Sequence, residues 1–189
     1  MGLLHSLLPF GAGVGLVAAL EYWRGKGLSP GPLGVPLRAQ GLVQGGKAPA
    51  GGQRFLAQRT ESTHKGVDIM APYGSPVYAA DAGSVAAAWP DGQVSGYGNT
   101  VVMWHPDGTQ TLYAHLDRFA DGIRRGAQRA KGDLLGYVGQ TQKPRGPMQT
   151  PPHLHFEAHA LQTLGINPNR PERLDPLAYL LMRGVKVAA

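Results

Sequence analysis

The sequence predicts a mainly β protein built from antiparallel strands. Three observations support this prediction: turn-forming residues are frequent, apolar and polar residues alternate over short segments, and tight turns join successive segments of this kind. The 189 residues include 28 Gly and 16 Pro, and only 16% of them are charged. Such a composition favours short strands and many turns over long helices. The length suffices for one well-packed domain with a small appendage.

Short strand-like segments and turn signals follow one another between residues 55 and 159. An Asp-Ala-Gly turn separates the first two segments, and His105-Pro-Asp-Gly separates the next two, which is a hairpin signal. Asp175 followed by Pro176 predicts the start of a short C-terminal helix that ends near Met182. The predicted strands are Ser75–Ala80, Ser84–Trp89, Thr100–Trp104, Thr109–Leu116, Leu134–Val138 and His153–Ala158.

The first 24 residues form a separate apolar segment, which we expect to be helical. Residues 3–20 are apolar except for His5 and Ser6, and as a helix they would span about 27 Å, the borderline for crossing a bilayer. The segment can be an uncleaved membrane anchor, the apolar part of an export signal, or an apolar arm that packs on a partner protein. We expect membrane or envelope association through residues 3–20.

Composition divides the rest of the chain into three parts. Residues 25–52 contain nine Gly and four Pro without hydrophobic periodicity, which predicts a linker. Residues 53–182 hold the strand pattern and the C-terminal helix and are the predicted folded domain. Residues 183–189 are the predicted tail.

Charge and cysteine content limit the partners and the chemistry. The net charge of +6 suits an anionic partner such as a cell wall polymer or a membrane surface. No basic stripe with interleaved aromatic residues is present, so we expect no nucleic acid partner. The chain has no Cys, which excludes disulfides and thiolate metal sites. A metal ion would have to bind His, Asp or Glu.

Candidate metal ligands occur in three separate segments. Strand alternation puts His153, His155 and Glu157 on one face and the intervening Leu and Phe on the other. Two imidazoles this close suit one zinc ion. In an extended segment His64 and Asp68 would also share a face. The third segment presents Thr111, Tyr113 and His115, which the same alternation predicts to share a face.

Several blocks occur in an order that resembles the lysostaphin-like (LytM-domain) zinc metalloendopeptidases, which hydrolyse peptidoglycan. The similarity covers roughly residues 53–180, and the ordered set is more specific than any single block. The resemblance implies antiparallel sheets that form an open groove in which a peptide lies extended. The blocks are His64-x-Gly-x-Asp68, Gly96-Tyr-Gly-Asn99, Tyr113-Ala-His-Leu116, Lys131-Gly132 and Pro152-His-Leu-His-Phe-Glu157.

The resemblance also implies roles for individual residues. His64, Asp68 and His155 resemble the ligands of one Zn²⁺ ion, and His115 and His153 the catalytic imidazoles, with the choice of general base open. Because Glu157 shares the face of His153 and His155, it is the candidate residue that orients a ligand histidine. The residues themselves, rather than the resemblance, make Tyr113 and Asn99 the candidate substrate contacts. Packing is the alternative role of Tyr113, and fixing a turn is the alternative role of Asn99.

The function implied by this resemblance is a zinc-dependent endopeptidase that hydrolyses peptide bonds in peptidoglycan, in cell wall remodelling or phage-type wall lysis. The alternative is a non-catalytic LytM-like module that binds the wall or activates another hydrolase; a cupin-like metal barrel ranks last. Residues 140–151 are longer, more basic and richer in Pro than the corresponding turn of the family, which predicts altered substrate preference. We expect an extracytoplasmic protein, anchored or exported in a bacterium, or alternatively a virion component.

Overall fold

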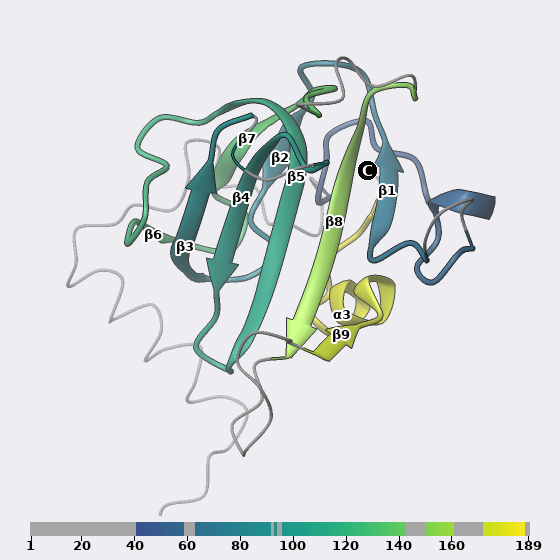
Figure 1. Cartoon of the computed structure of the whole chain (residues 1–189). Coiled ribbons are helices and arrows are strands. Elements are labelled where there is room, and N and C mark those ends of the chain that lie inside the picture. The colour runs from purple at the N-terminus through teal and green to yellow at the C-terminus, as the bar shows by residue number, and fades with distance from the viewer. Residues whose placement is uncertain are drawn as a thin grey trace, which may run out of the picture. The chain divides into compact units, whose positions relative to one another are not determined.

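An antiparallel sheet is the framework of the protein. The computed structural model describes residues 41–58, 63–91, 93, 96–142, 150–160 and 172–187. The main run of strands has the order β1-β8-β5-β4-β3-β6 (Figure 1), while β7 pairs with β2 and β5, and β9 pairs with β8. The elements are η1 (Gly51–Gln53), β1 (Val67–Met70), β2 (Pro76–Tyr78), β3 (Gly83–Trp89), β4 (Asn99–Trp104), β5 (Thr109–Phe119), β6 (Gln128–Arg129), β7 (Leu134–Val138), β8 (His153–Ala160), β9 (Glu172–Leu174) and α3 (Pro176–Met182).

The predicted fold class is confirmed by these strands. Each of the six predicted strands has a counterpart within a few residues, and all the strand pairs are antiparallel. The predicted C-terminal helix is α3, in which the Asp175 carboxylate caps the first turn by accepting a hydrogen bond from the Leu177 amide at 2.9 Å. The predicted N-terminal helix lies outside the described residues.

One face of the sheet packs against the hydrophobic core. Val101 on β4, Tyr113 on β5 and Phe156 on β8 are paired across the three strands, and all are fully buried. The rings of Tyr113 and Phe156 are 5.3 Å apart, and Tyr179 of α3 lies 6.4 Å from Phe156. Because these aromatic rings remove a large apolar area from water, they anchor α3 to this side of the sheet.

The opposite face of the sheet carries the candidate metal ligands, and we call it the site face. Paired residues on neighbouring strands place their side chains on the same face. His155 on β8 pairs with Asp68 on β1, and Glu157 pairs with Leu112 on β5, which in turn pairs with Val102 on β4. The site face therefore continues from β1 across β8 and β5 to β4.

The predicted linker overlaps the folded domain. Leu42 and Val43 are fully buried in the core, and Val43 forms a β-bridge with Val77 of β2. The Leu42 amide donates a hydrogen bond to the Lys186 carbonyl at 2.8 Å. The predicted domain start at residue 53 is therefore wrong, because tertiary contacts order residues 41–52 despite their Gly-rich composition.

The predicted tail also belongs to the domain as far as residue 187. Val185 is buried, and the Arg183 guanidinium lies 3.6 Å from the centre of the Tyr179 ring. Arg183 forms ion pairs with Asp81 and with Asp107. These contacts tie the chain after α3 to the turns at the edge of the sheet.

No helix within the described ranges is long and apolar enough to cross a membrane. Residues 3–20, for which the sequence predicts membrane association, lie outside those ranges.

Gly66 is expected to be essential for the pairing of β1 with β8. A Cβ atom at this position would lie 2.4 Å from the Phe156 carbonyl oxygen and 3.0 Å from Cε1 of His155. We predict that Gly66→Ala lowers the free energy of unfolding by about 1–3 kcal/mol, because the added methyl group must displace backbone. Urea unfolding of the full chain measures this loss. The control is Gly52→Ala, whose Cβ would meet no atom within 4 Å; equal losses in both variants would contradict the prediction.

Candidate metal centre

Three side-chain atoms of the kinds that bind zinc form a small triangle on the site face. Nε2 of His64 lies 3.0 Å from Oδ1 of Asp68 and 3.1 Å from Nδ1 of His155, and the third edge, from His155 Nδ1 to Asp68 Oδ1, is 2.8 Å. All three side chains are buried. Within the described part of the chain they form the one group of His, Asp or Glu whose ligand atoms are close enough to share an ion.

Backbone pairing brings the three residues together although 91 positions separate His64 from His155. Asp68 and His155 are directly paired across β1 and β8. His64 lies before β1 rather than in it, so the predicted shared strand is wrong for this residue. Its amide donates to the Ala57 carbonyl at 2.9 Å, and Gly66 lets the chain turn into β1 close to β8.

In His64 and His155, the ring nitrogen outside the triangle is hydrogen-bonded to another group, and this bond determines which nitrogen faces Asp68. Nδ1 of His64 lies 2.9 Å from the Arg54 carbonyl, which can only accept, so this nitrogen carries a proton. Nε2 of a neutral His64 therefore directs a lone pair at the Asp68 carboxylate, and a proton or a metal ion has to lie between them. Nε2 of His155 donates to Oε1 of Glu157 at 2.9 Å, which turns Nδ1 toward Asp68.

The donor set and the spacing fit zinc. Two imidazole nitrogens and one carboxylate oxygen are common zinc ligands, with bonds of about 2.0–2.2 Å. In a tetrahedral site such ligand atoms would be about 3.3 Å apart, so shifts of a few tenths of an ångström from the observed triangle suffice. With three protein ligands, a tetrahedral ion keeps one further position for water or substrate.

Burial and the mutual contacts of these groups shift their pKa values. Burial alone would raise the pKa of Asp68, but hydrogen bonds from His155 and His64 hold it well below its usual range. Burial alone would lower the pKa of His155, but the carboxylates of Asp68 and Glu157 raise it to about 9. Glu157 also keeps a lowered pKa, because His155 and His159 bond to it and outweigh its burial. The carboxylates are therefore ionised and strongly polarise the histidines.

His115 and His153, the two predicted catalytic imidazoles, lie beside the triangle. Their ring centres are 5.0 Å apart, and His115 is 5.8 Å from His155. Nε2 of His153 is 3.8 Å from Oδ1 of Asp68. Nδ1 of His115 donates to the Thr141 carbonyl and Nδ1 of His153 to the Pro151 carbonyl, both at 2.9 Å. Each ring is thereby fixed by a backbone carbonyl at Nδ1, and its Nε2 points away from the carbonyl that holds it.

Burial is also the main influence on the pKa of His115. Burial and the nearby charge of His155 lower the pKa of His115 to about 3. At neutral pH His115 is therefore uncharged, and its Nε2 carries the lone pair because Nδ1 holds the proton. Its Nε2 can therefore act as an acceptor, and the same lowered pKa makes it a weaker base than a free imidazole.

The predicted alternation along β5 fails at His115. Its backbone has a φ of 60°, a left-handed conformation that a residue with a Cβ rarely adopts. Ala114 pairs with His155, yet the unusual backbone at the next residue sends the His115 ring to the same side. Tyr113 consequently faces the core. It is fully buried and its hydroxyl accepts from the Ala80 amide, so the predicted contact of Tyr113 with substrate is wrong.

Asn99 joins the loops around His115. Its side-chain amide donates to the carbonyls of Leu116 and Asp117 at 3.0 and 2.8 Å, and its Oδ1 accepts from the Asp91 amide at 2.7 Å. Its backbone amide donates to Thr141, the residue whose carbonyl holds His115. The structure thus gives Asn99 the role of fixing the turn, and these bonds occupy the groups with which it was predicted to contact substrate.

Glu157 connects the triangle to two residues that the sequence analysis did not assign to the site. The Tyr97 hydroxyl donates to Oε1 of Glu157 at 2.8 Å, and Nε2 of His159 lies 2.8 Å from Oε2. The burial of Tyr97 and the charge of Glu157 raise the pKa of the phenol. Both residues had a signal in the sequence: Tyr97 lies within one of the family blocks, and His159 continues the period-two pattern of His153, His155 and Glu157.

Comparisons with known proteins identify the family of this chain. Residues 62–168 match the model of Peptidase family M23. The DD-carboxypeptidase/endopeptidase Mpg of Neisseria meningitidis serogroup B (strain MC58) is 39% identical over 113 residues, which cover 59% of this chain and 23% of Mpg. The lipoprotein YgeR of Escherichia coli K12 is 32% identical over 123 residues, covering 65% of this chain and 41% of YgeR. The chain thus spans less than half the length of either relative.

A solved structure shares the fold. The catalytic domain of the antimicrobial peptidase lysostaphin from Staphylococcus simulans superposes with a TM-score of 0.55 and 25% identity, covering 72% of this chain and 92% of that domain. The candidate metal ligands and both further histidines lie inside the region that matches the family model. This match covers more than half of the sequence, and the protein therefore belongs to peptidase family M23.

Proposed function

We propose that the protein is a zinc endopeptidase that hydrolyses peptide bonds in peptidoglycan. One observation carries the proposal: the triangle of His64, Asp68 and His155 lies next to two further imidazoles, His115 and His153, whose outer nitrogens are fixed by backbone carbonyls. Three ligands and two adjacent proton-transfer groups are the parts that metal-assisted hydrolysis requires.

Nε2 of His64, Oδ1 of Asp68 and Nδ1 of His155 would hold the zinc. When bound, zinc supplies Lewis acidity, which polarises a carbonyl and makes water more acidic. Glu157 holds His155 by its other ring nitrogen and favours the tautomer that leaves Nδ1 for the metal. Tyr97 bonds to Oε1 of Glu157 and His159 bonds to Oε2, and together they keep the carboxylate in place.

His115 and His153 are the proposed proton-transfer residues. The Nδ1 proton of each is bound to a carbonyl, so Nε2 of each ring, when it carries no proton, is the atom that can take one up from the attacking water. The protonated ring can then donate that proton to the departing amine. The burial of both rings excludes bulk water, which strengthens these interactions.

The proposed substrate and location follow from the relatives and from charge. The name of Mpg gives it carboxypeptidase and endopeptidase activity, and YgeR is named a lipoprotein. The net charge of +6 suits an anionic wall polymer. We therefore propose an extracytoplasmic protein that acts on peptidoglycan, with residues 3–20 as the segment that associates with the membrane or envelope.

Digestion of purified sacculi tests the proposed activity. The zinc-loaded full chain should release soluble fragments whose cleaved peptide bond mass spectrometry identifies, and a chelator should stop the release. If the chain binds sacculi equally with and without zinc and releases nothing, it is a non-catalytic wall-binding module instead.

Zinc should stabilise the fold through Asp68. When zinc is added to the chelator-treated protein at 100 times its dissociation constant, we expect the free energy of unfolding to rise by about 2.7 kcal/mol. Asp68→Asn should lose this gain, because a neutral amide cannot replace the carboxylate in the triangle. Thermal unfolding with and without zinc measures the effect. Asp121→Asn, at an exposed turn, is the control and should keep the gain; a full gain in Asp68→Asn would refute the assignment of this ligand.

Substitution of a proposed ligand histidine and substitution of a proposed proton-transfer histidine should affect zinc binding differently. His155→Ala should abolish stoichiometric zinc binding, because it removes a ligand. His115→Ala should retain one zinc per chain, while the rate of sacculus hydrolysis falls about 10²–10⁴-fold, the usual contribution of a general acid or base. Elemental analysis and the release assay measure the two quantities on the same samples. Equal zinc loss in both variants would show that the division of roles is wrong.

A further inference from the structure

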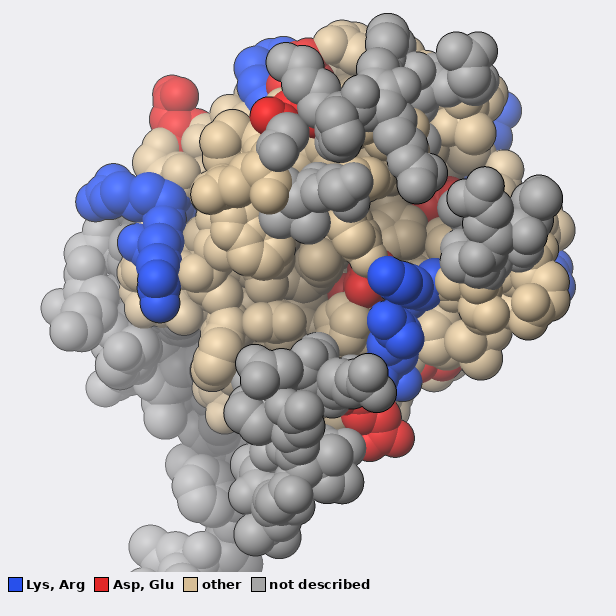
Figure 2. All heavy atoms as spheres, in the orientation of Figure 1, with Lys and Arg blue, Asp and Glu red and all other residues tan. Residues whose placement is uncertain are grey.

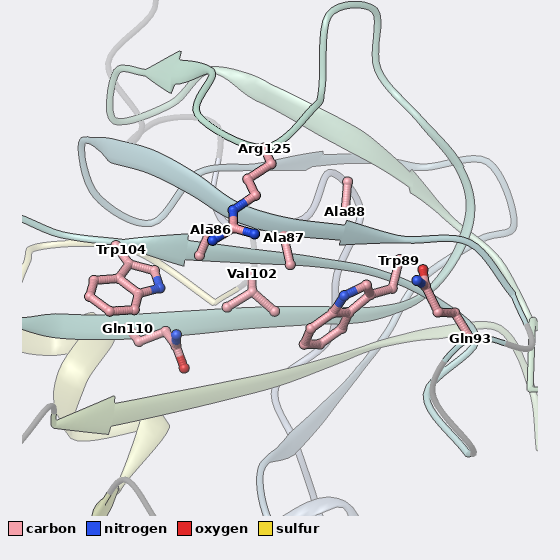
Figure 3. A pocket seen from close by; sticks show the side chains of 9 residues that line it. All are labelled: Ala86, Ala87, Ala88, Trp89, Gln93, Val102, Trp104, Gln110 and Arg125. Carbon is pink, nitrogen blue, oxygen red and sulfur yellow. The ribbon is translucent and has the colours of Figure 1, made fainter. Parts of the chain in front are cut away.

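We propose that the site face carries a second binding site, for the glycan strand of the polymer whose peptide lies at the metal centre. The choice of this ligand rests on the proposed function. The site is an open depression of about 460 Å³ over β3, β4 and the beginning of β5 (Figure 3). Its lining includes Trp89, Trp104, Gln110 and Arg125.

Strand register places the depression on the same face of the sheet as the metal centre. Trp104 pairs with Gln110, and Gln110 pairs with His159. Val102, on the floor of the depression, likewise continues through Leu112 to Glu157. A ligand can therefore extend from the depression across β5 to the histidines without passing around an edge of the sheet.

The distance along this face suits one branched polymer. Trp104 lies two strands away from β8, which is about 10 Å. Through Gln110 it is level with His159 of β8, which lies four residues from His155, or about 13 Å along the strand. The two positions are thus roughly 16 Å apart, a span that about five extended residues cover. A sugar bound at Trp104 and a peptide attached to it can therefore occupy the two sites at once.

The side chains that line the depression have the chemistry of a saccharide site. Trp104 is 50% exposed although it is a large apolar residue, and its indole lies beside Gln110, while Trp89 lies at the other end with Gln93 (Figure 3). Indole rings offer flat apolar surfaces that match the C–H faces of sugar rings. Glutamine amides donate and accept hydrogen bonds, as hydroxyl and acetamido groups require.

Charge favours a ligand with isolated carboxylates. Arg125 reaches from the loop after β5 over Ala86 and Ala87 (Figure 3), and the described residues that line the depression include no Asp or Glu. The surface over β3, β4, β5 and β8 is mainly uncharged, with both basic and acidic side chains at its margins (Figure 2). A single-stranded nucleic acid would need a basic groove that follows its backbone. One guanidinium between two indoles instead suits a mostly neutral glycan with occasional acidic groups.

Direct binding measurements on the zinc-loaded full chain test the site. The probe is a tetramer of β-1,4-linked N-acetylglucosamine, followed by NMR of the indole N–H groups and by calorimetry. We expect the tetramer to shift the indole signals of Trp89 and Trp104. Trp104→Ala should weaken its binding about tenfold, which is within the range lost when an aromatic ring that stacks on a nucleobase is removed. Arg125→Gln, an exposed substitution that leaves the core intact, should weaken binding of a muramic acid-containing fragment more than that of the tetramer.

The control and the activity assay separate this proposal from the proposed function. Leu181→Ala removes a side chain that is 77% exposed on α3, outside the depression, and should leave tetramer binding unchanged. In Trp104→Ala, the ratio of sacculus hydrolysis to hydrolysis of a glycan-free cross-linked peptide should fall about tenfold. A wild-type chain that cleaves sacculi but does not bind the tetramer would overturn the glycan site alone. Tetramer binding without any cleavage would overturn the proposed function alone, and tighter Trp104-dependent binding of oligothymidylate would identify the depression as a nucleic acid site.

Discussion

The antiparallel pairing of β1 with β8 is the constraint on which the rest of the site depends. It sets Asp68 beside His155, and it requires Gly66 because the β8 backbone passes where a Cβ atom would lie. The same pairing buries the Asp68 carboxylate, which would be costly without cationic or hydrogen-bonding partners. His64 and His155 supply these partners. The register of two short strands therefore sets the positions of Asp68 and His155, two of the candidate metal ligands, and the contacts of the Asp68 carboxylate keep it ionised.

Around these candidate ligands, one ring nitrogen of each imidazole is fixed by a hydrogen bond to a neighbouring group. The partner of His64 is the Arg54 carbonyl, that of His155 is the Glu157 carboxylate, and that of His115 is the Thr141 carbonyl. All three partner groups lie outside the triangle. This pattern orients the rings before any ion or substrate arrives, which reduces the reorganisation that binding requires. The left-handed backbone at His115 is part of the same arrangement, since it turns this ring toward the others.

Much of the fold could be predicted from the sequence because local patterns determine it, whereas the set of candidate ligands and proton-transfer histidines came from the resemblance to the LytM-domain peptidases. Alternation located the strands, and the spacing of His153, His155 and Glu157 placed all three on one face. Failures occurred where tertiary structure overrode the local pattern. The positive φ of His115 cannot be recognised from the residue types. Strict alternation therefore placed Tyr113 on the same face as His115, whereas it lies in the core. Leu42 and Val43 pack into the core from a segment that resembles a linker. His159 was visible in the same alternation but lay beyond the matched blocks.

X-ray absorption at the zinc edge tests the central claim most directly, since it reports the ligands of the ion itself. For the full chain with one equivalent of zinc, we predict a shell of nitrogen and oxygen ligands at about 2.0–2.1 Å, with the outer scattering of two imidazoles. Substitution of His64 should reduce this imidazole scattering to that of one ring. A zinc shell without imidazole scattering, or one unaffected by the loss of His64, would contradict the convergence of His64, Asp68 and His155 on a single ion.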